Sequence, residues 1–126
     1  MNKPECKTLS SGTKFWYLNG VRHREDGPAI EWASGDEEWY LNGNRHREDG
    51  PAIEYKNGHK EWRINGKLHR EDGPAIEWAG GSKKWWLKDE EVHPETIVDL
   101  WLSRGVFCWY DETNGCLNFG EKDEQT

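Results

Sequence analysis

Histidine and acidic side chains recur together at one fixed spacing. The segment His-Arg-Glu-Asp-Gly-Pro-Ala-Ile-Glu occurs three times without change, starting at His23, His46 and His69, which are 23 residues apart. A histidine beside carboxylates suits metal binding or proton transfer. Nitrogens around one zinc ion lie within about 4 Å of each other, whereas equivalent residues of successive hairpins lie about 10 Å apart. The histidines are therefore interpreted as structural, each packing on a ring and bonding a loop carbonyl, with metal binding and pH sensing as alternatives.

The carboxylates of the repeated segment are the other candidates for chemistry. Acid–base catalysis by Glu25 with Asp26 would need one site with two different environments, and three identical copies argue against an enzyme. Each Asp is expected to close its own turn, and the Gly after it to supply an unusual backbone angle. The residues concerned are Asp26, Asp49, Asp72, Gly27, Gly50 and Gly73.

The arginines of the same segment have two expected contacts. Arg24, Arg47 and Arg70 are predicted to pair with the neighbouring acids or to lie over Trp rings. No metal and no cofactor is expected.

A repeat at this spacing predicts a stacked array of one small unit. Each unit contains an Ala-Ile-Glu-aromatic run, a turn and a second run of the form Trp-Tyr-Leu-Asn-Gly, which together predict a β-hairpin. Two-residue turns are expected at Ser34-Gly35, Asn57-Gly58 and Gly80-Gly81, because Asn and Gly accept positive φ. The predicted fold is mainly β: an elongated antiparallel β-meander of 23-residue hairpin repeats with a short helix and a final hairpin as a cap.

The predicted turns also predict which side chains share a face. A two-residue turn places Ile30 opposite Trp39, so one face would be aromatic and the other largely acidic. The rings would be covered by the polar segments, by a partner or by a second copy, or would form a thin core with exposed edges. The candidate binding residues are Trp39, Tyr40, Trp62, Arg63, Glu38, Glu54 and Glu61.

The chain is divided into four parts. Residues 1–5 are expected to be a disordered tail and residues 6–92 the array, with units near 6–28, 29–51, 52–74 and 75–92. Residues 93–120 are expected to form the cap, and residues 121–126 an acidic tail. Within the cap, Pro, early acids, a late Arg and a final Gly predict a helix in residues 93–105, docked through Ile97, Val98, Trp101 and Leu102. Residues 106–111 and 116–119 are expected to form the last hairpin through Asn114-Gly115.

The composition excludes several classes of partner. The chain of 126 residues has a formal net charge of -7 and nine Trp, so direct binding to nucleic acid or to anionic membranes is disfavoured. Three scattered cysteines, Cys6, Cys108 and Cys116, predict neither a disulfide scaffold nor a zinc site. No signal peptide or membrane-spanning run is found. A cytoplasmic location is expected, in the host cytoplasm if the chain is phage-encoded.

The repeat unit resembles a MORN-type repeat, specifically the MORN variant of YwqK-type bacterial antitoxin proteins. Tyr40, Gly43, His46 and Gly50 match, in order, the aromatic residue, Gly, His and Gly of that family's motif, although three residues, Arg-Glu-Asp, separate His from Gly here. In the third unit Arg63 replaces the aromatic residue. The resemblance covers residues 6–91 and implies an elongated antiparallel sheet that serves as an interaction platform, sometimes lipid-binding or dimeric, without shared catalytic residues.

Three functions are compatible with these features. The first is a non-enzymatic protein-binding module, an inhibitor or antitoxin-like antagonist such as a phage or bacterial anti-defence factor. It would bind another protein through its aromatic face, or dock its acidic face on a basic groove that normally holds nucleic acid. The second is a carbohydrate-binding array, and the third a self-assembling protein or homodimer whose aromatic faces cover each other. Measurements at high salt would distinguish these mechanisms, because screening weakens docking driven by charge but not docking driven by burial of the rings.

Overall fold

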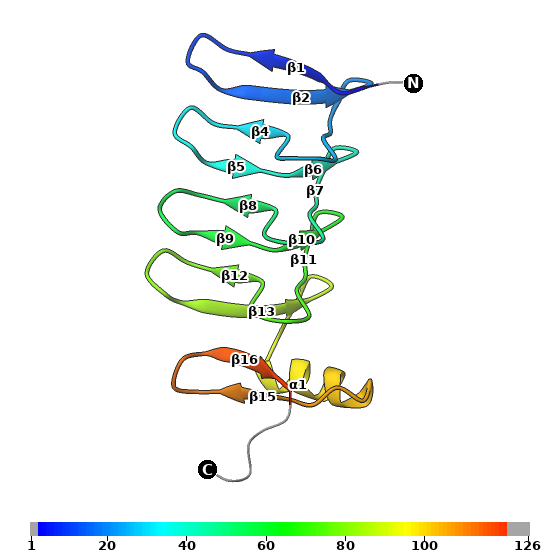
Figure 1. Cartoon of the computed structure of the whole chain (residues 1–126), viewed down its shortest axis with the longest axis vertical. Helices are drawn as coiled ribbons and strands as arrows, with labels where there is room; N and C mark the ends of the chain where they lie inside the picture. Colours follow the sequence, from blue (N-terminus) through cyan, green and yellow to red (C-terminus); the bar gives the residue numbers. More distant parts are fainter. Residues whose placement is uncertain (1–2, 121–126) are drawn as a thin grey trace.

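The computed structural model describes residues 3–120 as a stack of β-hairpins closed by one helix and a last hairpin (Figure 1). The fold is mainly β and antiparallel, as predicted. The first half of the array contains β1 (Glu5–Thr8), β2 (Lys14–Leu18), β3 (Val21–Arg22), β4 (Ile30–Glu31), β5 (Glu37–Glu38), β6 (Tyr40–Leu41) and β7 (Asn44–Arg45). The rest contains β8 (Ile53–Glu54), β9 (Lys60–Glu61), β10 (Arg63–Ile64), β11 (Lys67–Leu68), β12 (Ile76–Glu77), β13 (Lys83–Leu87), β14 (Glu90–Val92), α1 (Pro94–Ser103), β15 (Cys108–Asp111) and β16 (Cys116–Phe119).

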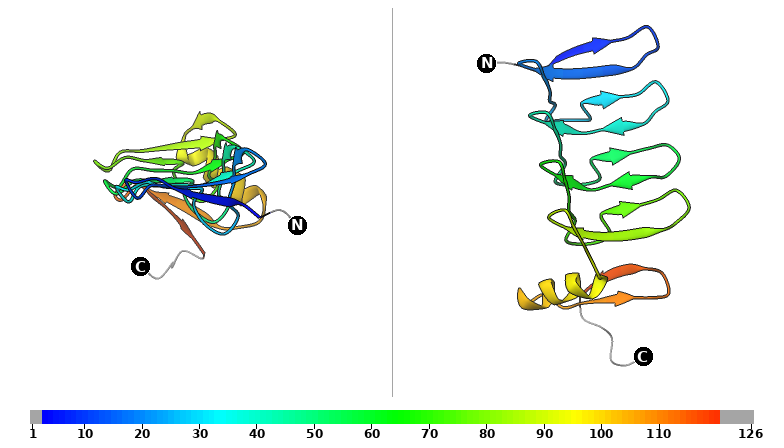
Figure 2. Two further views of the ribbon diagram at one scale, coloured as in Figure 1. Left: turned by 90° about the horizontal axis from the view of Figure 1, so that it is seen from above. Right: turned by 180° about the vertical axis from the view of Figure 1, so that it is seen from behind.

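One ten-stranded sheet runs through the array in the order β1-β2-β4-β5-β8-β9-β12-β13-β14, with β3 beside β2. Three further two-stranded sheets are β6-β7, β10-β11 and β15-β16. The hairpin tips point to one side of the stack, and the chain passes from unit to unit on the other side (Figure 2). Each unit is hydrogen-bonded to the next, as expected for a repeat architecture.

The tip turns differ from the prediction. The N–H of Trp32 donates to the carbonyl of Asp36 at 2.9 Å, so Ala33, Ser34 and Gly35 form a three-residue loop. Gly35 has φ 96°, which suits the left-handed third position of such a loop. The same bonds and angles recur at Gly12, Gly58 and Gly81. The predicted two-residue turns at these tips are therefore wrong.

Two-residue turns occur at the other end of each hairpin. Asn19 and Gly20 have φ 52° and 81° between the paired residues Leu18 and Val21, which is the type I′ pattern. The two following units repeat it at Asn42-Gly43 and Asn65-Gly66. In the fourth unit Lys88 and Asp89 adopt the same angles, φ 49° and 69°.

The longer tip loop shifts one strand of each hairpin by one residue and changes both faces. Ile30 pairs with Glu38, Ile53 with Glu61 and Ile76 with Lys84, not with Trp39, Trp62 and Trp85. A shift of one residue moves every side chain of that strand to the opposite face. The "Trp face" includes Cys6, Lys14, Trp16, Leu18, Glu31, Glu37, Trp39, Leu41, Glu54, Lys60, Trp62, Ile64, Glu77, Lys83, Trp85 and Leu87, and the "Ile face" includes Phe15, Tyr17, Ile30, Trp32, Glu38, Tyr40, Ile53, Tyr55, Glu61, Arg63, Ile76, Trp78, Lys84 and Trp86.

The separation into an aromatic face and an acidic face is therefore wrong. Both faces carry rings, and the predicted ladder of Glu31, Glu38, Glu54, Glu61 and Glu77 is divided between them. On the Trp face the neighbouring acids are Glu31, Glu37 and Glu54, which lie opposite one another on β4, β5 and β8.

The cap agrees with the predicted helix and hairpin. Helix α1 has Pro94 in its first turn, and the side chain of His93 caps it by accepting from the N–H of Glu95. Ile97 and Val98 are buried, at 0% and 7% exposure, whereas Leu102, a predicted docking residue, is 47% exposed. At the other end β1 begins at Glu5, which was assigned to the tail. Met1, Asn2 and residues 121–126 lie outside the described residues.

Candidate protein-binding surface

The three repeated polar segments form loops that connect successive hairpins, and we call residues 23–28, 46–51 and 69–74 the crossing loops. In the first, the guanidinium carbon of Arg24 lies 3.9 Å from the centroid of the Trp16 ring. The same guanidinium donates to Asp26 Oδ1 at 3.1 Å, to the carbonyl of Pro28 at 3.1 Å and to Glu31 Oε2 at 3.0 Å. Stacking and hydrogen bonding thus hold one arginine against one ring.

The other two crossing loops repeat this arrangement. Arg47 lies 3.9 Å above Trp39, and Arg70 lies 3.8 Å above Trp62. Each bonds the Asp two residues later and the carbonyl of the following Pro. Both expected arginine contacts are confirmed. The crossing loops, one of the predicted alternatives, cover these rings.

The aspartates and glycines of the loops have other roles than predicted. Asp26, Asp49 and Asp72 accept from the arginines, so the interpretation that each closes its own turn is corrected. Gly27, Gly50 and Gly73 are not among the residues with positive φ. A Cβ at Gly27 would lie 2.7 Å from the guanidinium carbon of Arg24, and the distances at Gly50 and Gly73 are 2.9 and 2.6 Å. Glycine provides room for the arginine, not an unusual angle.

The histidines join each crossing loop to the following unit. Nδ1 of His23 accepts from the N–H of Asn42 at 2.9 Å, His46 accepts from Asn65 at 2.9 Å and His69 from Lys88 at 3.0 Å. Because Nδ1 accepts, the ring proton lies on Nε2. His23 and His46 are buried, at 6% and 9% exposure. Their role is structural, but the partner is a backbone N–H group and not the predicted carbonyl.

The carboxylates of the first two crossing loops are the most exposed part of this surface. The side chains of Glu25, Asp26, Glu48 and Asp49 are 82–89% exposed. Three pockets, each with a ring and an aliphatic side chain on its walls, lie beside the first crossing loop, between the first and the second, and between the second and the third. Trp16 and Leu18 line the first, Trp39 and Leu41 the second, and Trp62 and Ile64 the third. The Trp face therefore carries a row of three pockets, and carboxylates outnumber arginines around the second and the third.

The third of these pockets is larger than the other two, at about 670 Å³, and the cap completes it. Trp101 of α1 lines it and donates through Nε1 to the carbonyl of Glu71. Arg104 bonds Glu71 Oε1 at 2.8 Å, and this hydrogen bond, against the opposing effect of burial, lowers the pKa of Glu71. The C-terminal cap is thus joined to the third crossing loop.

The Ile face has a different organisation, centred on a buried carboxylate. Glu38 is 5% exposed and accepts from Trp32 Nε1 at 2.8 Å, from the Tyr40 hydroxyl at 3.0 Å and from Arg45 at 3.1 Å. Burial, reinforced by the charge of Glu38, raises the pKa of Tyr40. A carboxylate with these partners maintains the fold and is not available to another protein.

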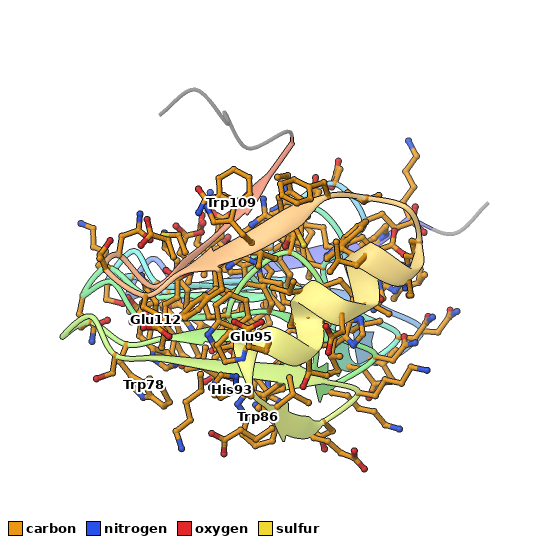
Figure 3. The ribbon with its side chains drawn as sticks, turned by 90° about the horizontal axis from the view of Figure 1, so that it is seen from below. Trp78, Trp86, His93, Glu95, Trp109 and Glu112 are labelled. Carbon is orange, nitrogen blue, oxygen red and sulfur yellow. The ribbon has the colours of Figure 1, made fainter. Side chains whose placement is uncertain are left out.

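The next unit repeats the arrangement with other residues. Glu61 accepts from Arg63 at 2.9 Å and lies 2.8 Å from Nε2 of His59. Burial acts to raise the pKa of Glu61, but these hydrogen bonds and charges outweigh it and lower that pKa. At the far end, Trp78 and Trp86 point to the same side of the sheet, away from Trp109 (Figure 3).

The structure divides the candidate binding residues into two groups. Trp39, Trp62 and Glu54 lie on the Trp face, whereas Tyr40, Arg63, Glu38 and Glu61 lie on the Ile face. One surface therefore does not contain them all. Sequence reasoning missed the exposed Glu25 and Glu48, which it considered only as catalytic groups. The sequence did draw attention to these two residues, because the segment that contains them is repeated without change.

Comparisons with known protein families, with curated proteins and with solved structures find no match. The resemblance of the chain to MORN-type repeats, including the YwqK-type antitoxin proteins, stays a prediction.

Within residues 3–120, no group of three or more His, Cys, Asp or Glu side chains is arranged to hold a metal ion. No helix in this part of the chain is long and apolar enough to span a membrane.

Proposed function

We propose that the chain is a non-enzymatic module that binds another protein through the acidic pocket row of the Trp face. The observation that carries the proposal is the repetition of one pocket type along the three crossing loops. Each pocket offers an aliphatic side chain, the accessible part of a half-buried ring whose face is covered by arginine, and exposed carboxylates. This combination suits a Lys or Arg side chain, whose stem is apolar and whose end is charged.

The spacing of the pockets favours an extended partner segment. Successive units are separated by two strands of about 4.8 Å each, which gives about 10 Å per pocket. A polyproline II helix has three residues per turn and rises about 3.1 Å per residue, so every third side chain points the same way at about 9.3 Å intervals. A Pro-rich segment with a cation at every third position therefore matches the row.

The same surface supports the antagonist role. A basic segment that normally contacts nucleic acid carries the cations that the rim would neutralise. Occupying that segment would block the other interaction without any catalysis. The carbohydrate-binding and self-assembling alternatives relied on open Trp faces. Arg24, Arg47 and Arg70 instead cover the rings of the Trp face.

Calorimetric titration with synthetic peptides tests the proposal. The probe is (Pro-Pro-Arg)n with five repeats, and the control has the same composition with its arginines in one block. We expect the periodic peptide to bind at least about tenfold more tightly, because several pockets are occupied together. Equal affinity for both peptides would show that net charge alone attracts them and would refute the proposed row. Tight binding of a (Pro-Pro-Gln)n peptide would equally refute the role of the carboxylates.

A further inference from the structure

Strand β1 forms an open edge of the ten-stranded sheet. It pairs with β2, and within residues 3–120 no strand pairs with its other side (Figure 1). All four of its residues, Glu5 to Thr8, are exposed. An edge of this kind presents backbone N–H and C=O groups to which another strand can bind.

The hydrogen bonds of the neighbouring residues show which groups point outward. The N–H of Leu9 donates inward, to the carbonyl of Thr13 at 2.9 Å. Trp16, which lies opposite Cys6, donates to Ala29 and accepts from His23, away from β1. Cys6 and Trp16 are therefore a non-hydrogen-bonded pair. In an antiparallel ladder this directs the backbone groups of Cys6 and Thr8, and the carbonyl of Pro4, to the open edge.

We propose that a second copy of this chain pairs antiparallel with β1, with the two-fold axis at Cys6. Each Cys6 N–H then donates to the Cys6 carbonyl of the other copy, and each Thr8 N–H donates to the carbonyl of Pro4. Pro4 has no N–H group, so the ladder ends there. The interaction differs from the predicted contact between aromatic faces, because it uses the edge of the sheet.

The charges of β1 select this register. Residues whose backbone groups point to the open edge lie opposite each other only when the two-fold axis passes through a residue and not between two residues. An axis at Glu5 places two glutamates together, and an axis at Lys7 places two lysines together. An axis at Thr8 extends the pairing into the turn after β1, and an axis at Pro4 pairs two residues that have no N–H group to donate. With the axis at Cys6, Glu5 lies opposite Lys7 twice. Opposite charges across strands stabilise the pair, whereas like charges destabilise it.

The pairing would also double the pocket row. Cys6 shares the Trp face because it lies opposite Trp16, and the two-fold axis of an antiparallel strand pair is perpendicular to the sheet. The Trp faces of both copies therefore lie on the same side of one continuous sheet. A partner with two basic segments would meet two rows at once, which increases its apparent affinity without new contacts.

Sedimentation velocity of the reduced full-length chain at increasing concentration tests the register. The unmodified chain is expected to dimerise reversibly. Lys7→Glu and Glu5→Lys should each weaken dimerisation at least about tenfold, because two attractive pairs become repulsive. An equimolar mixture of the two variants should form a heterodimer, since every cross-strand pair is again attractive. Lys67→Glu, an exposed charge reversal on β11, should leave dimerisation unchanged.

Mild oxidation provides a second measurement. Paired Cα atoms in a hydrogen-bonded site lie about 5.5 Å apart, within the range for a disulfide. A covalent dimer should form through Cys6 and persist in Cys116→Ser, whose cysteine is the other exposed one. The proposal is overturned if the chain stays monomeric, if Lys67→Glu weakens the dimer as much as Lys7→Glu, or if the mixture associates no better than the single variants. A covalent dimer that requires Cys116 would also overturn it.

Discussion

Trp39 and Trp85 occupy equivalent positions on the Trp face but are covered by different parts of the chain. Arg47, eight residues later, lies over Trp39. One period after Arg70, position 93 holds a histidine that caps α1. Trp85 instead packs edge-on against Tyr110 of β15, with ring centroids 5.8 Å apart, and is 5% exposed.

This difference shows that each Trp ring of the row is packed against another part of the chain, and that two different parts of the chain do this. In the inner units an arginine of the next crossing loop covers the ring and adds charge to the surface. At the end of the array, where no further unit follows, the apolar cap does so. The rings are thus structural, and the exposed carboxylates around them are the part that can meet a partner.

The largest expected effect comes from disrupting the cap. Ile97 is fully buried at 0% exposure, so Ile97→Asp places an unpaired carboxylate among apolar side chains. We expect a loss of about 3–5 kcal/mol in the free energy of unfolding, measured by urea denaturation. Leu102→Asp, at a site that is 47% exposed, is the matched control with a change below about 1 kcal/mol. Similar losses in both variants would contradict the role of the cap.

Removing a ring from an inner unit should have the next largest effect. Trp62→Ala removes the surface on which Arg70 stacks and should cost about 3 kcal/mol. The double variant Trp62→Ala, Arg70→Ala should cost less than the sum of the single changes, because the two side chains form one unit. Strict additivity in urea denaturation would show that the stacking does not contribute.

A smaller effect is expected from filling the space beneath an arginine. Gly50→Ala brings a Cβ to 2.9 Å from the guanidinium carbon of Arg47 and should displace this flexible side-chain end from Trp39 at a cost of about 1 kcal/mol. Gly80→Ala is the matched control, since no atom lies within 4 Å of its Cβ. The control should be neutral or slightly stabilising. Equal thermal shifts in the two variants would indicate a general intolerance of alanine.

The smallest effect concerns pH and the link between the cap and the third crossing loop. Arg104 lowers the pKa of Glu71 in the folded protein, below the unfolded value of about 4.3. The ionised pair therefore stabilises the fold above that value, and its contribution is lost as pH falls through the lowered folded pKa. Arg104→Gln should be less stable than the unmodified chain at neutral pH, and the difference should vanish in acid. A difference that persists at pH 2 would assign the effect to packing.

Much of the architecture was predictable because the repeat is explicit. The period, the hairpins, the helix start at Pro94 and the last hairpin all follow from residue types with strong local preferences. The placement of Arg24, Arg47 and Arg70 over Trp rings was also predicted, since acids and rings are the usual partners of arginine.

The register was not predictable because the hairpin tips fit two turn types. Ser34-Gly35 suits a two-residue turn, but glycine at the third position of a longer loop satisfies the same preference for positive φ. Apolar patterning did not resolve the choice, because Trp39 and its neighbour Tyr40 offer a ring to each face. One residue of shift then divided the candidate binding residues between the two faces. The role of Gly27 was hidden for another reason, since it depends on a side chain that folds back over it.

The most direct test of the central claim is a titration that compares two charge-neutralised variants with the periodic (Pro-Pro-Arg)n peptide. Glu25→Gln, Glu48→Gln removes two exposed carboxylates of the crossing loops and leaves the Asp–Arg pairs intact. Asp99→Asn, Glu112→Gln removes the same charge from exposed positions in the cap. We predict that the first variant loses at least about tenfold in affinity, while the second binds like the unmodified chain. Equal losses in both variants would contradict the claim that the crossing-loop carboxylates form the binding surface.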